Sequence, residues 1–399
     1  MGIPLPTASD PRRLPISQHV ERKENLTNMS LALGTATARP GEITYGEFDL
    51  VEHPLGGSDH LPVILVQGRK DGPTFWLTAG IHGVEHAGIQ VIHKLLTPEL
   101  VRDLRGAIVA IPALNPAGLR TMQRQAYYHD GDPNRLFPDG KPEKPPDPDK
   151  EPPSALEMAY ARLFEHIHKT AHFYFDLHCA STNSISFVFR DRVLYRKDEN
   201  EAKNKAEAEA LDARLAEMCT AYGHSVVAEF PVERYLDEKL HRSTTSAAIN
   251  VAHIPALTAE LGTGHMPDPA IVRASATGLR NVLRWAGMLP GDPEPITGIK
   301  VVQPGFSCRH RSVARVPQSS IIHHLVEPGD RVKVGDPLCE MRDIWGRPLG
   351  EGVLRSEYDG WVISRAHGIV FYPTQATVWM AVRDEGPMVQ PYPDDYFKD

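Results

Sequence analysis

Between about residues 42 and 290, short apolar runs with β-strand character alternate with segments that have helical spacing. The run RGAIVAIPALNP is almost entirely apolar, as expected for a strand that is buried on both faces of a sheet. Helical spacing is clear in EHAGIQVIHKLLTPELV and in SALEMAYARLFEHIHKT, where Ser154 and Glu157 occupy the positions of a capping box. This alternation predicts an α/β domain with a sheet covered by helices on both faces.

Two segments interrupt the alternation. The Pro-rich stretch 138–153 cannot fold regularly, because proline removes a backbone donor and blocks helix, so we interpret it as a surface insertion. Beyond residue 292 the helical spacing stops, and short alternating runs between Gly-Asp and Asp-Gly turns predict an all-β region. We therefore expect an N-terminal arm at 1–41, an α/β catalytic domain at 42–292 and a C-terminal β domain at 293–399.

The composition excludes several classes of protein. A net charge of −8 argues against a nucleic-acid partner, which requires a clustered basic face. No apolar run reaches the roughly 20 residues of a membrane span, and the first residues lack the apolar core of a secretory signal. The four cysteines are far apart and form no C-x-x-C motif, which favours a reduced, cytoplasmic setting.

The stretch LTAGIHGVEHAG leads an apolar strand directly into a cluster of imidazoles and a carboxylate. The spacing of His82 and Glu85 suits a metal site, but H-x-x-[DE] also occurs elsewhere in the chain, so the spacing alone proves nothing. The position of His82 and Glu85 directly after an apolar strand favours a metal site, because open α/β folds place their sites at the carboxyl ends of parallel strands. His86 is a third candidate nitrogen, but it falls within the helical turn that follows. The alternative without a metal is that these polar side chains only cap the start of the following helix and face solvent there.

A second apolar strand, FYFDLHCAS, ends in His178, with Asp176 two residues earlier on the same strand face. We expect the carboxylate of Asp176 to orient a neighbouring imidazole by hydrogen bonding to the ring nitrogen that does not face the metal. Two histidines and a glutamate, with a fourth position left for water, form the ligand set of a catalytic zinc. The sequence therefore predicts one Zn²⁺ held by His82, Glu85 and His178.

A third strand, PALTAELG, ends in Glu260. An unpaired carboxylate is costly to bury, so Glu260 needs a partner or a task. Metal-assisted hydrolysis requires a base near the attacking water, and Glu260 is our candidate for that base. In DGDPNRLFPDG, Asn134 and Arg135 suit the binding of an anionic substrate end, because arginine binds carboxylates through a bidentate fork. The alternative for Arg135 is that it is a surface residue on a turn with no role in binding.

In order, the motifs GIHGVEH, NPAG, DPNRLFPDG, FDLHCAS and ALTAELG resemble those of the aspartoacylase/succinylglutamate desuccinylase branch of the zinc carboxypeptidase-like hydrolases. The resemblance covers about residues 45–290. It implies a carboxypeptidase-like fold with a mixed, mainly parallel sheet and a C-terminal β module. It also implies that the zinc ligands are His82, Glu85 and His178.

The same resemblance makes Glu260 the general base and makes Asn134 and Arg135 the pair that binds the substrate's α-carboxylate. Arg124 lies near where the family places another arginine by the metal and the scissile carbonyl. The segment RQAYYHDGDPNR holds one residue more than the usual spacing, and Pro133 replaces the usual leucine. Arg120 is therefore the alternative to Arg124 for stabilising the oxyanion.

The runs VEPGDRVKVGDPLCE and YDGWVISR resemble a biotinyl/lipoyl-like β sandwich. A carrier domain would show a lysine at the tip of its central hairpin, and CEMRDIWGRPLGEG has none. We therefore interpret this region as a structural or access-shaping module at the rim of the site or at an oligomer contact.

The resemblance implies a zinc-dependent amidohydrolase that cleaves small-molecule N-acyl amino acids. One alternative is a metallocarboxypeptidase that acts on peptides with the same chemistry in a wider cleft. Another is a non-catalytic metal- or ligand-binding relative, although such proteins usually lose at least one of the groups retained here. The sequence excludes a nucleic-acid or membrane partner and leaves open whether the chain forms a homo-oligomer.

Overall fold

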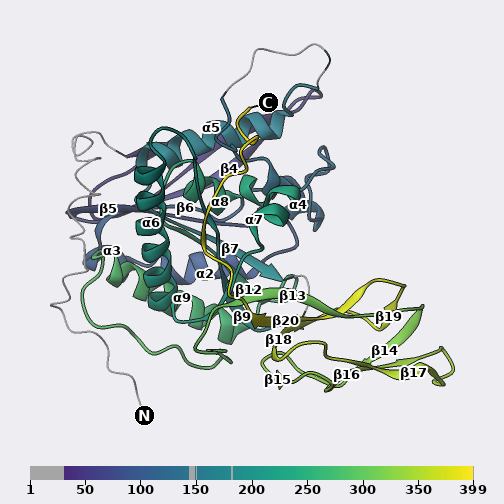
Figure 1. Cartoon of the computed structure of the whole chain (residues 1–399). Coiled ribbons are helices and arrows are strands. Elements are labelled where there is room, and N and C mark those ends of the chain that lie inside the picture. Colours follow the sequence, from purple (N-terminus) through teal and green to yellow (C-terminus); the bar gives the residue numbers. More distant parts are fainter. Residues whose placement is uncertain (1–30, 143–148, 150, 181–182, 399) are drawn as a thin grey trace.

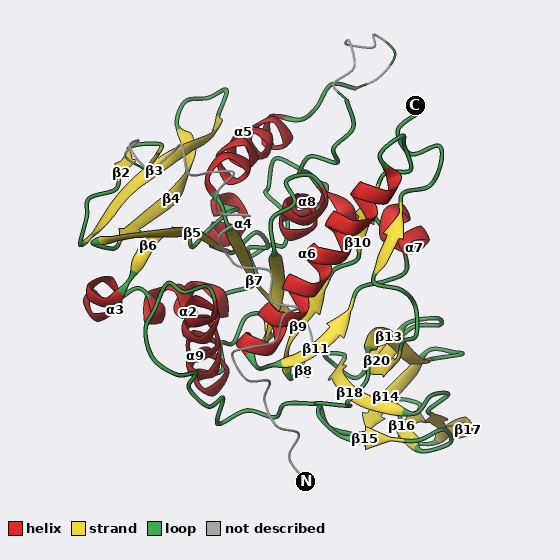
Figure 2. Cartoon of the chain, turned by 60° about the vertical axis from the view of Figure 1, so that its left-hand side comes forward, coloured by secondary structure: helices red, strands yellow, loops and turns green. Residues whose placement is uncertain are grey.

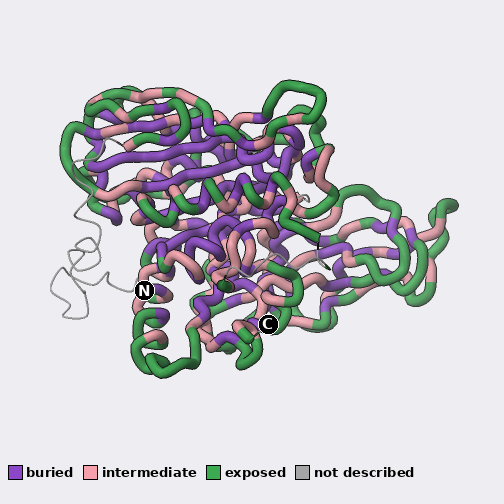
Figure 3. Tube along the Cα trace, turned by 90° about the horizontal axis from the view of Figure 1, so that it is seen from above, coloured by how far each residue is buried: buried purple, intermediate pink, exposed green. Residues whose placement is uncertain are grey.

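The computed structural model describes residues 31–142, 149, 151–180 and 183–398. An α/β part carries the helices, and a narrower β arm projects from it (Figure 1). Seen from above, the buried residues follow the central strands of the α/β part and continue into the base of the arm (Figure 3). None of the helices in the described ranges has both the length and the apolar character that crossing a membrane requires.

A single large sheet connects the two parts. From one edge to the other it contains β15 (Arg331–Val332), β18 (Gly360–Arg365), β20 (Ala376–Arg383), β13 (Cys308–Arg315), β11 (Ser225–Ala228), β9 (Ser186–Arg190), β12 (Ala256–Thr263), β7 (Phe173–Ala180), β5 (Lys70–Ala79), β6 (Arg105–Ile111), β4 (Ser58–Gln67) and β3 (Glu42–Glu52). Neighbouring strands from β12 to β6 are parallel, whereas β9 is antiparallel to β12. The sheet is therefore mixed and mainly parallel in its α/β part, as predicted.

Helices cover both faces of the sheet in the α/β part, which confirms the predicted fold class (Figure 2). One face carries α2 (Ala87–Leu95), α6 (Glu201–Tyr222) and α9 (Pro269–Trp285). The other carries α4 (Pro116–Thr121), α5 (Ala155–Thr170) and α8 (Thr244–Asn250). Helix α5 starts where the capping box predicts, with the Glu157 amide donating to Ser154 Oγ at 3.1 Å. Shorter helical segments are α3 (Pro98–Asp103), α7 (Val232–Asp237), η2 (Pro133–Arg135) and η3 (Leu240–Arg242).

The arm contains a second, antiparallel sheet packed on the end of the large one. Its strands are β17 (Pro348–Arg355), β16 (Pro337–Arg342), β14 (Ser320–His324) and β19 (Val370–Phe371). Apolar side chains between the sheets, among them Ile322, Leu338 and Val378, form a core separate from that of the α/β part. The predicted all-β character after residue 292 is thus confirmed.

The N-terminal region of the α/β part begins with a hairpin of β1 (Ala32–Leu33) and β2 (Ala36–Thr37). Leu33 and Ala36 are buried in the main core, so these residues pack against the sheet. Residues 1–30 of the predicted arm, and 143–148 and 150 of the predicted insertion, lie outside the described residues. The proposed boundaries at 41/42 and 292/293 remain predictions.

Beyond the arm, the chain returns to the α/β part as a segment that we call the strap, residues 384–397. Its strand β21 (Val389–Pro391) pairs with β10 (Val193–Tyr195), and Tyr392 is buried against Tyr235 and Leu194. Arg192 anchors the strap. Its side chain is only 1% exposed, pairs with Asp384 and donates to the Pro387 carbonyl at 2.9 Å.

We predict that Arg192→Met lowers the free energy of unfolding by about 3–5 kcal/mol, because it leaves the Asp384 carboxylate, whose side chain is only 9% exposed, without its partner. Denaturant unfolding followed by circular dichroism measures the change. Arg102→Met is the matched control, since Arg102 is exposed and pairs with exposed Asp103, and it should shift stability by no more than about 0.5 kcal/mol. Equal effects of the two substitutions would contradict the anchoring role of Arg192.

Candidate metal centre and its surroundings

The His82–Glu85 loop leaves the end of β5 through a tight turn. Gly80 adopts the left-handed conformation, with φ of +66°, which glycine tolerates without strain. Gly83 packs against the backbone of Gly118 so closely that a side chain there would overlap it. Asn115, from the NPAG motif, donates to the Ile81 carbonyl at 3.2 Å and to the Arg124 carbonyl at 3.3 Å. The loop is therefore fixed by backbone contacts to the start of α4.

In strand β7, side chains alternate between the two faces of the sheet, and this alternation places His178 at the site. Phe173 and Phe175 point to one face, where they meet Trp285 of α9 and Tyr222 of α6. Asp176 and His178 point to the other face, toward α8. The apolar sequence of the strand thus buries one face under helices and turns a carboxylate and an imidazole toward the site.

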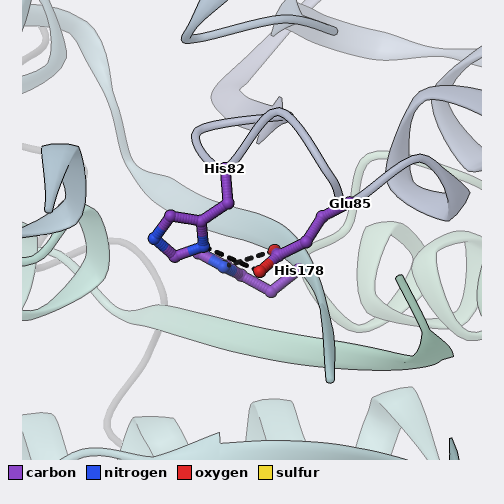
Figure 4. Close-up of side chains that lie close together, drawn as sticks. All are labelled: His82, Glu85 and His178. Carbon is purple, nitrogen blue, oxygen red and sulfur yellow. Dashed lines mark hydrogen bonds and ion pairs between the residues drawn. The ribbon is translucent and has the colours of Figure 1, made fainter. Parts of the chain in front are cut away.

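The structure brings His82, Glu85 and His178 together, as the sequence predicts (Figure 4). All three are buried, and their candidate ligand atoms lie within 4.8 Å of one another. His82 Nδ1 lies 2.7 Å from Glu85 Oε1, and His178 Nδ1 lies 3.0 Å from Glu85 Oε2. Burial raises the pKa of Glu85, but the charges of the two imidazoles outweigh burial and hold that pKa well below its usual range. His86 lies outside this group, with Nε2 directed at the Gly83 carbonyl.

A second layer of carboxylates holds the far nitrogen of each imidazole. Asp176 Oδ2 lies 2.8 Å from His178 Nε2, as predicted for an orienting residue. Asp132 Oδ1 lies 2.9 Å from His82 Nε2. Each carboxylate fixes its imidazole with Nδ1 facing Glu85, which is how proteins orient histidines toward a metal ion. The donor set of two nitrogens and a carboxylate therefore fits a divalent cation.

Sequence reasoning missed Asp132. The residue was visible only as the acid of a second H-x-x-D match, with His129, and it lies 50 positions from the imidazole that it holds. Its place directly before Pro133 in the DPNR loop was the available signal, because that loop was already a candidate for substrate binding.

Glu260 lies beside His178 because β12 pairs with β7 in parallel register, with Glu260 opposite His178. Its Oε2 atom is buried and finds no hydrogen-bond partner in the described part of the protein. Burial, followed by the charge of Glu85, raises the pKa of Glu260 to about 7. Strand pairing thus places an unsatisfied carboxylate next to the candidate ligands without making it one of them.

The two candidate arginines occupy different places. Arg124 Nη2 donates to Asp132 Oδ2 at 2.8 Å, and its Nη1 lies 3.6 Å from Glu85 Oε1. Arg120 points away and pairs with Asp59. Of the two, only Arg124 has its guanidinium at the metal group.

Asn134 and Arg135 lie on η2, which follows Asp132. Asn134 is buried, with Nδ2 3.5 Å from His178 Nε2, and its Oδ1 accepts from the Thr244 amide at 2.9 Å. Arg135 donates to two backbone carbonyls, those of Asn134 and Glu238. No carboxylate within the described ranges forms an ion pair with it, although its charge lowers the pKa of the nearby carboxyl groups of Asp132, Asp191 and Glu229.

The fold and the buried His-Glu-His group define an α/β protein with a candidate metal centre. Residues 71–286, more than half of the chain, match the family described as the succinylglutamate desuccinylase/aspartoacylase catalytic domain. The chain therefore belongs to this family of N-acyl amino acid deacylases and desuccinylases.

Two curated relatives show how far the sequence similarity extends. The chain is 25% identical over 313 residues to an N-alpha-acetyl-L-2,4-diaminobutyric acid deacetylase from Halomonas elongata, covering 77% of this chain and 82% of the relative. It is 28% identical over 151 residues to a succinylglutamate desuccinylase from Yersinia pseudotuberculosis, covering 38% of this chain and 44% of that protein.

Solved structures share the fold at lower identity. The succinylglutamate desuccinylase/aspartoacylase from Rhodobacter sphaeroides matches with a TM-score of 0.64 and 22% identity, covering 86% of this chain and 96% of that one. The product-bound ectoine utilization protein EutE (DoeB) from Ruegeria pomeroyi matches with a TM-score of 0.63 and 19% identity, covering 86% and 95%.

We predict that the purified protein binds about one divalent cation per chain and that His82→Ala and His178→Ala abolish this binding. Asp132→Asn should weaken metal affinity by roughly 10- to 100-fold, because it removes the carboxylate that orients His82. Metal analysis after dialysis, and competition with a chelator, measure both effects. His86→Ala is the matched control and should retain the metal. Full retention in either ligand variant would contradict the assignment.

Proposed function

We propose that this protein is a zinc-dependent amidohydrolase that cleaves N-acyl amino acids to a carboxylic acid and a free amino acid. The observation that carries the proposal is the buried His82–Glu85–His178 group with Glu260 beside it, whose buried Oε2 atom has no hydrogen-bond partner among the described residues. Family membership supports the reaction class. The Halomonas relative is named as a deacetylase, so Nα-acetyl amino acids are the first substrates to test.

Zinc is the proposed ion because two imidazoles, one carboxylate and one open position are its usual catalytic ligand set. His82, Glu85 and His178 would hold it. When bound, the ion supplies Lewis acidity, which lowers the pKa of water and polarises an amide carbonyl.

In the proposed reaction, the oxygen of water bonds to the acyl carbon and the carbon–nitrogen bond breaks. Glu260 takes one proton from the water and gives it to the departing amine nitrogen. Arg124 donates hydrogen bonds to the oxygen on which negative charge develops, and one such donor contributes roughly 3 kcal/mol to the transition state. Arg135 and Asn134 bind the α-carboxylate of the substrate, Arg135 through its guanidinium fork and Asn134 from a side chain that the Thr244 amide holds in place.

A panel of N-acyl amino acids and dipeptides, tested with the zinc-loaded protein, examines the proposal directly. Hydrolysis of Nα-acetyl amino acids without cleavage of dipeptides would support it and exclude a metallocarboxypeptidase. Cleavage of dipeptides alone would favour the peptidase. Absence of turnover of every N-acyl amino acid in the panel by metal-loaded protein would contradict the proposal.

We predict that Glu260→Gln keeps the metal and lowers kcat by roughly 10²- to 10⁴-fold, because the amide retains the size of the side chain but cannot act as a base. Metal analysis and steady-state kinetics on the same preparation separate the two effects. Glu351→Gln, on the exposed surface of β17, is the control and should behave as the wild type. Loss of metal from Glu260→Gln would make Glu260 a ligand, and full activity would refute its catalytic role.

A second prediction concerns the α-carboxylate of the substrate. Replacing it with a methyl ester should lower kcat/KM sharply, because Arg135 then loses its anionic partner. Arg135→Lys should also lower kcat/KM for the acid, since a point charge cannot reproduce the bidentate fork, and should narrow the difference between acid and ester. Equal turnover of acid and ester by the wild type would show that this arginine does not bind the carboxylate.

A further inference from the structure

A buried carboxylate that the proposed mechanism does not use contacts the loop that carries Arg124. Asp59, near the start of β4, is only 1% exposed. Its Oδ1 atom accepts from Arg120 Nη2, and its Oδ2 atom accepts from the Tyr128 hydroxyl at 3.1 Å. Arg120 belongs to the last turn of α4, whereas Tyr128 belongs to the segment 122–131 that follows, which we call the Arg124 loop. One carboxylate therefore ties both the helix and the loop to the sheet, and we call this arrangement the clamp.

His53, which directly follows β3, packs on the same group. Its Nε2 atom lies 3.6 Å from Asp59 Oδ1. The centre of its ring lies 5.3 Å from that of Tyr128 and 6.1 Å from that of Tyr127. The two tyrosine rings meet edge to face with their centres 5.0 Å apart, an arrangement that aromatic pairs favour. The second half of the Arg124 loop thus rests against the end of the β3–β4 hairpin.

The charges within the clamp favour the ionised form of Asp59. Burial raises the pKa of Asp59, but the hydrogen bonds from Arg120 and Tyr128 and the charge of Arg120 outweigh burial and lower that pKa below its usual value. Burial and the charge of Asp59 raise the pKa of Tyr128, so its hydroxyl keeps the proton that it donates. Hydrogen bonds with one charged partner are stronger than those between neutral groups. The clamp is therefore intact at neutral pH.

Other contacts hold the first half of the Arg124 loop. The Gln123 amide donates to a carbonyl of α4 at 2.9 Å, and Asn115 donates to the Arg124 carbonyl at 3.3 Å. Ala126, in the middle of the loop, is buried in the main core. Tyr128 connects the second half to β4 through the clamp. The clamp thus fixes the loop on the side that leads into the DPNR motif.

The position of this loop matters because Arg124 has a long side chain whose donors must be placed accurately. That side chain is 41% exposed, and its guanidinium reaches Asp132 at 2.8 Å and Glu85 at 3.6 Å. A displacement of about 1 Å of a catalytic group can cost a factor of about 100 in rate. We infer that Asp59 is a positioning residue, which clamps α4 and the Arg124 loop to β4 and so fixes the guanidinium of Arg124 where the oxyanion of the proposed reaction develops. The inference rests on the proposed function, and it gives Arg120 a task other than oxyanion stabilisation.

Asp59→Asn tests the positioning role, because the amide keeps the size of the side chain but loses the charge that holds Arg120. With zinc-loaded protein and an N-acyl amino acid that the wild type hydrolyses, kcat and kcat/KM should fall together by about tenfold or more, since an oxyanion donor acts in the transition state. Asp49→Asn is the matched control and should keep the wild-type rate, because Asp49 lies on neighbouring β3, is 90% exposed and pairs with His60. Wild-type kcat in Asp59→Asn would overturn the inference.

A double-mutant cycle with Arg124 separates positioning from general structural damage. If Asp59 acts through Arg124, then Asp59→Asn in an Arg124→Met background should lower kcat by less than about twofold further, because the group that it positions is gone. An equal loss of kcat in both backgrounds would show a merely structural role for Asp59 and would overturn the inference.

Hydrogen exchange of the metal-free protein tests the clamp without any measurement of activity. Amide hydrogens of the Arg124 loop, including that of Gln123, should exchange about tenfold faster in Asp59→Asn and faster by a smaller factor in Tyr128→Phe, which removes one neutral donor. Asp49→Asn should exchange like the wild type. Unchanged exchange of the loop in both clamp variants would overturn the inference. Absence of hydrolysis of every N-acyl amino acid by the wild type would refute the proposed function instead, whatever the exchange rates, so the two failures are distinguishable.

Discussion

The carboxylate of Glu85 is the group on which the candidate centre depends. Its two oxygens receive one imidazole each, from His82 and His178, and Oε2 also accepts the Cys179 amide at 3.0 Å. A buried carboxylate without such partners would cost several kcal/mol. Because His82 and Glu85 follow β5 while His178 and Cys179 belong to β7, the parallel pairing of these two strands and the assembly of the site are one structural requirement. Any shift of register between them would separate the donors from Glu85.

Much of this arrangement is predictable from the sequence, because parallel strands end at the same edge of a sheet. Apolar runs that end in His82, His178 and Glu260 are sufficient to predict that the three side chains lie at one edge of the sheet, and β12 pairs with β7 so that Glu260 lies opposite His178. Asp132 is not predictable in this way. It belongs to a loop, and its contact with His82 depends on the path of the chain between α4 and α5, which hydrophobic periodicity does not encode.

The ends of β9 and β11 illustrate a second limit. Asp191 and Glu229 follow ordinary short strands, and each reads in isolation as a polar residue at the start of a loop. Because β9 runs antiparallel to β12, with Phe189 opposite Thr258, the residues after β9 lie toward the edge of the sheet where β12 begins and not toward the edge where His178 and Glu260 lie. Strand direction within a mixed sheet is set by tertiary packing, and a single sequence contains no local signal for it.

The strap has a consequence for the way in which this region forms and opens. Arg192 and Asp384 lie 192 positions apart, and the loop that their contact closes contains the segment from β10 to α9 as well as the whole β arm. Closing so long a loop is entropically costly and slow, so the strap docks after the sheet has formed. Held by a three-residue strand and a small aromatic cluster, it is also a unit that opens at lower free energy than the core. Amide hydrogens of β10 and β21 should therefore exchange with solvent well before those of β5 and β7, and each opening would loosen Tyr235, whose hydroxyl donates to Asp191 Oδ1 at 3.1 Å.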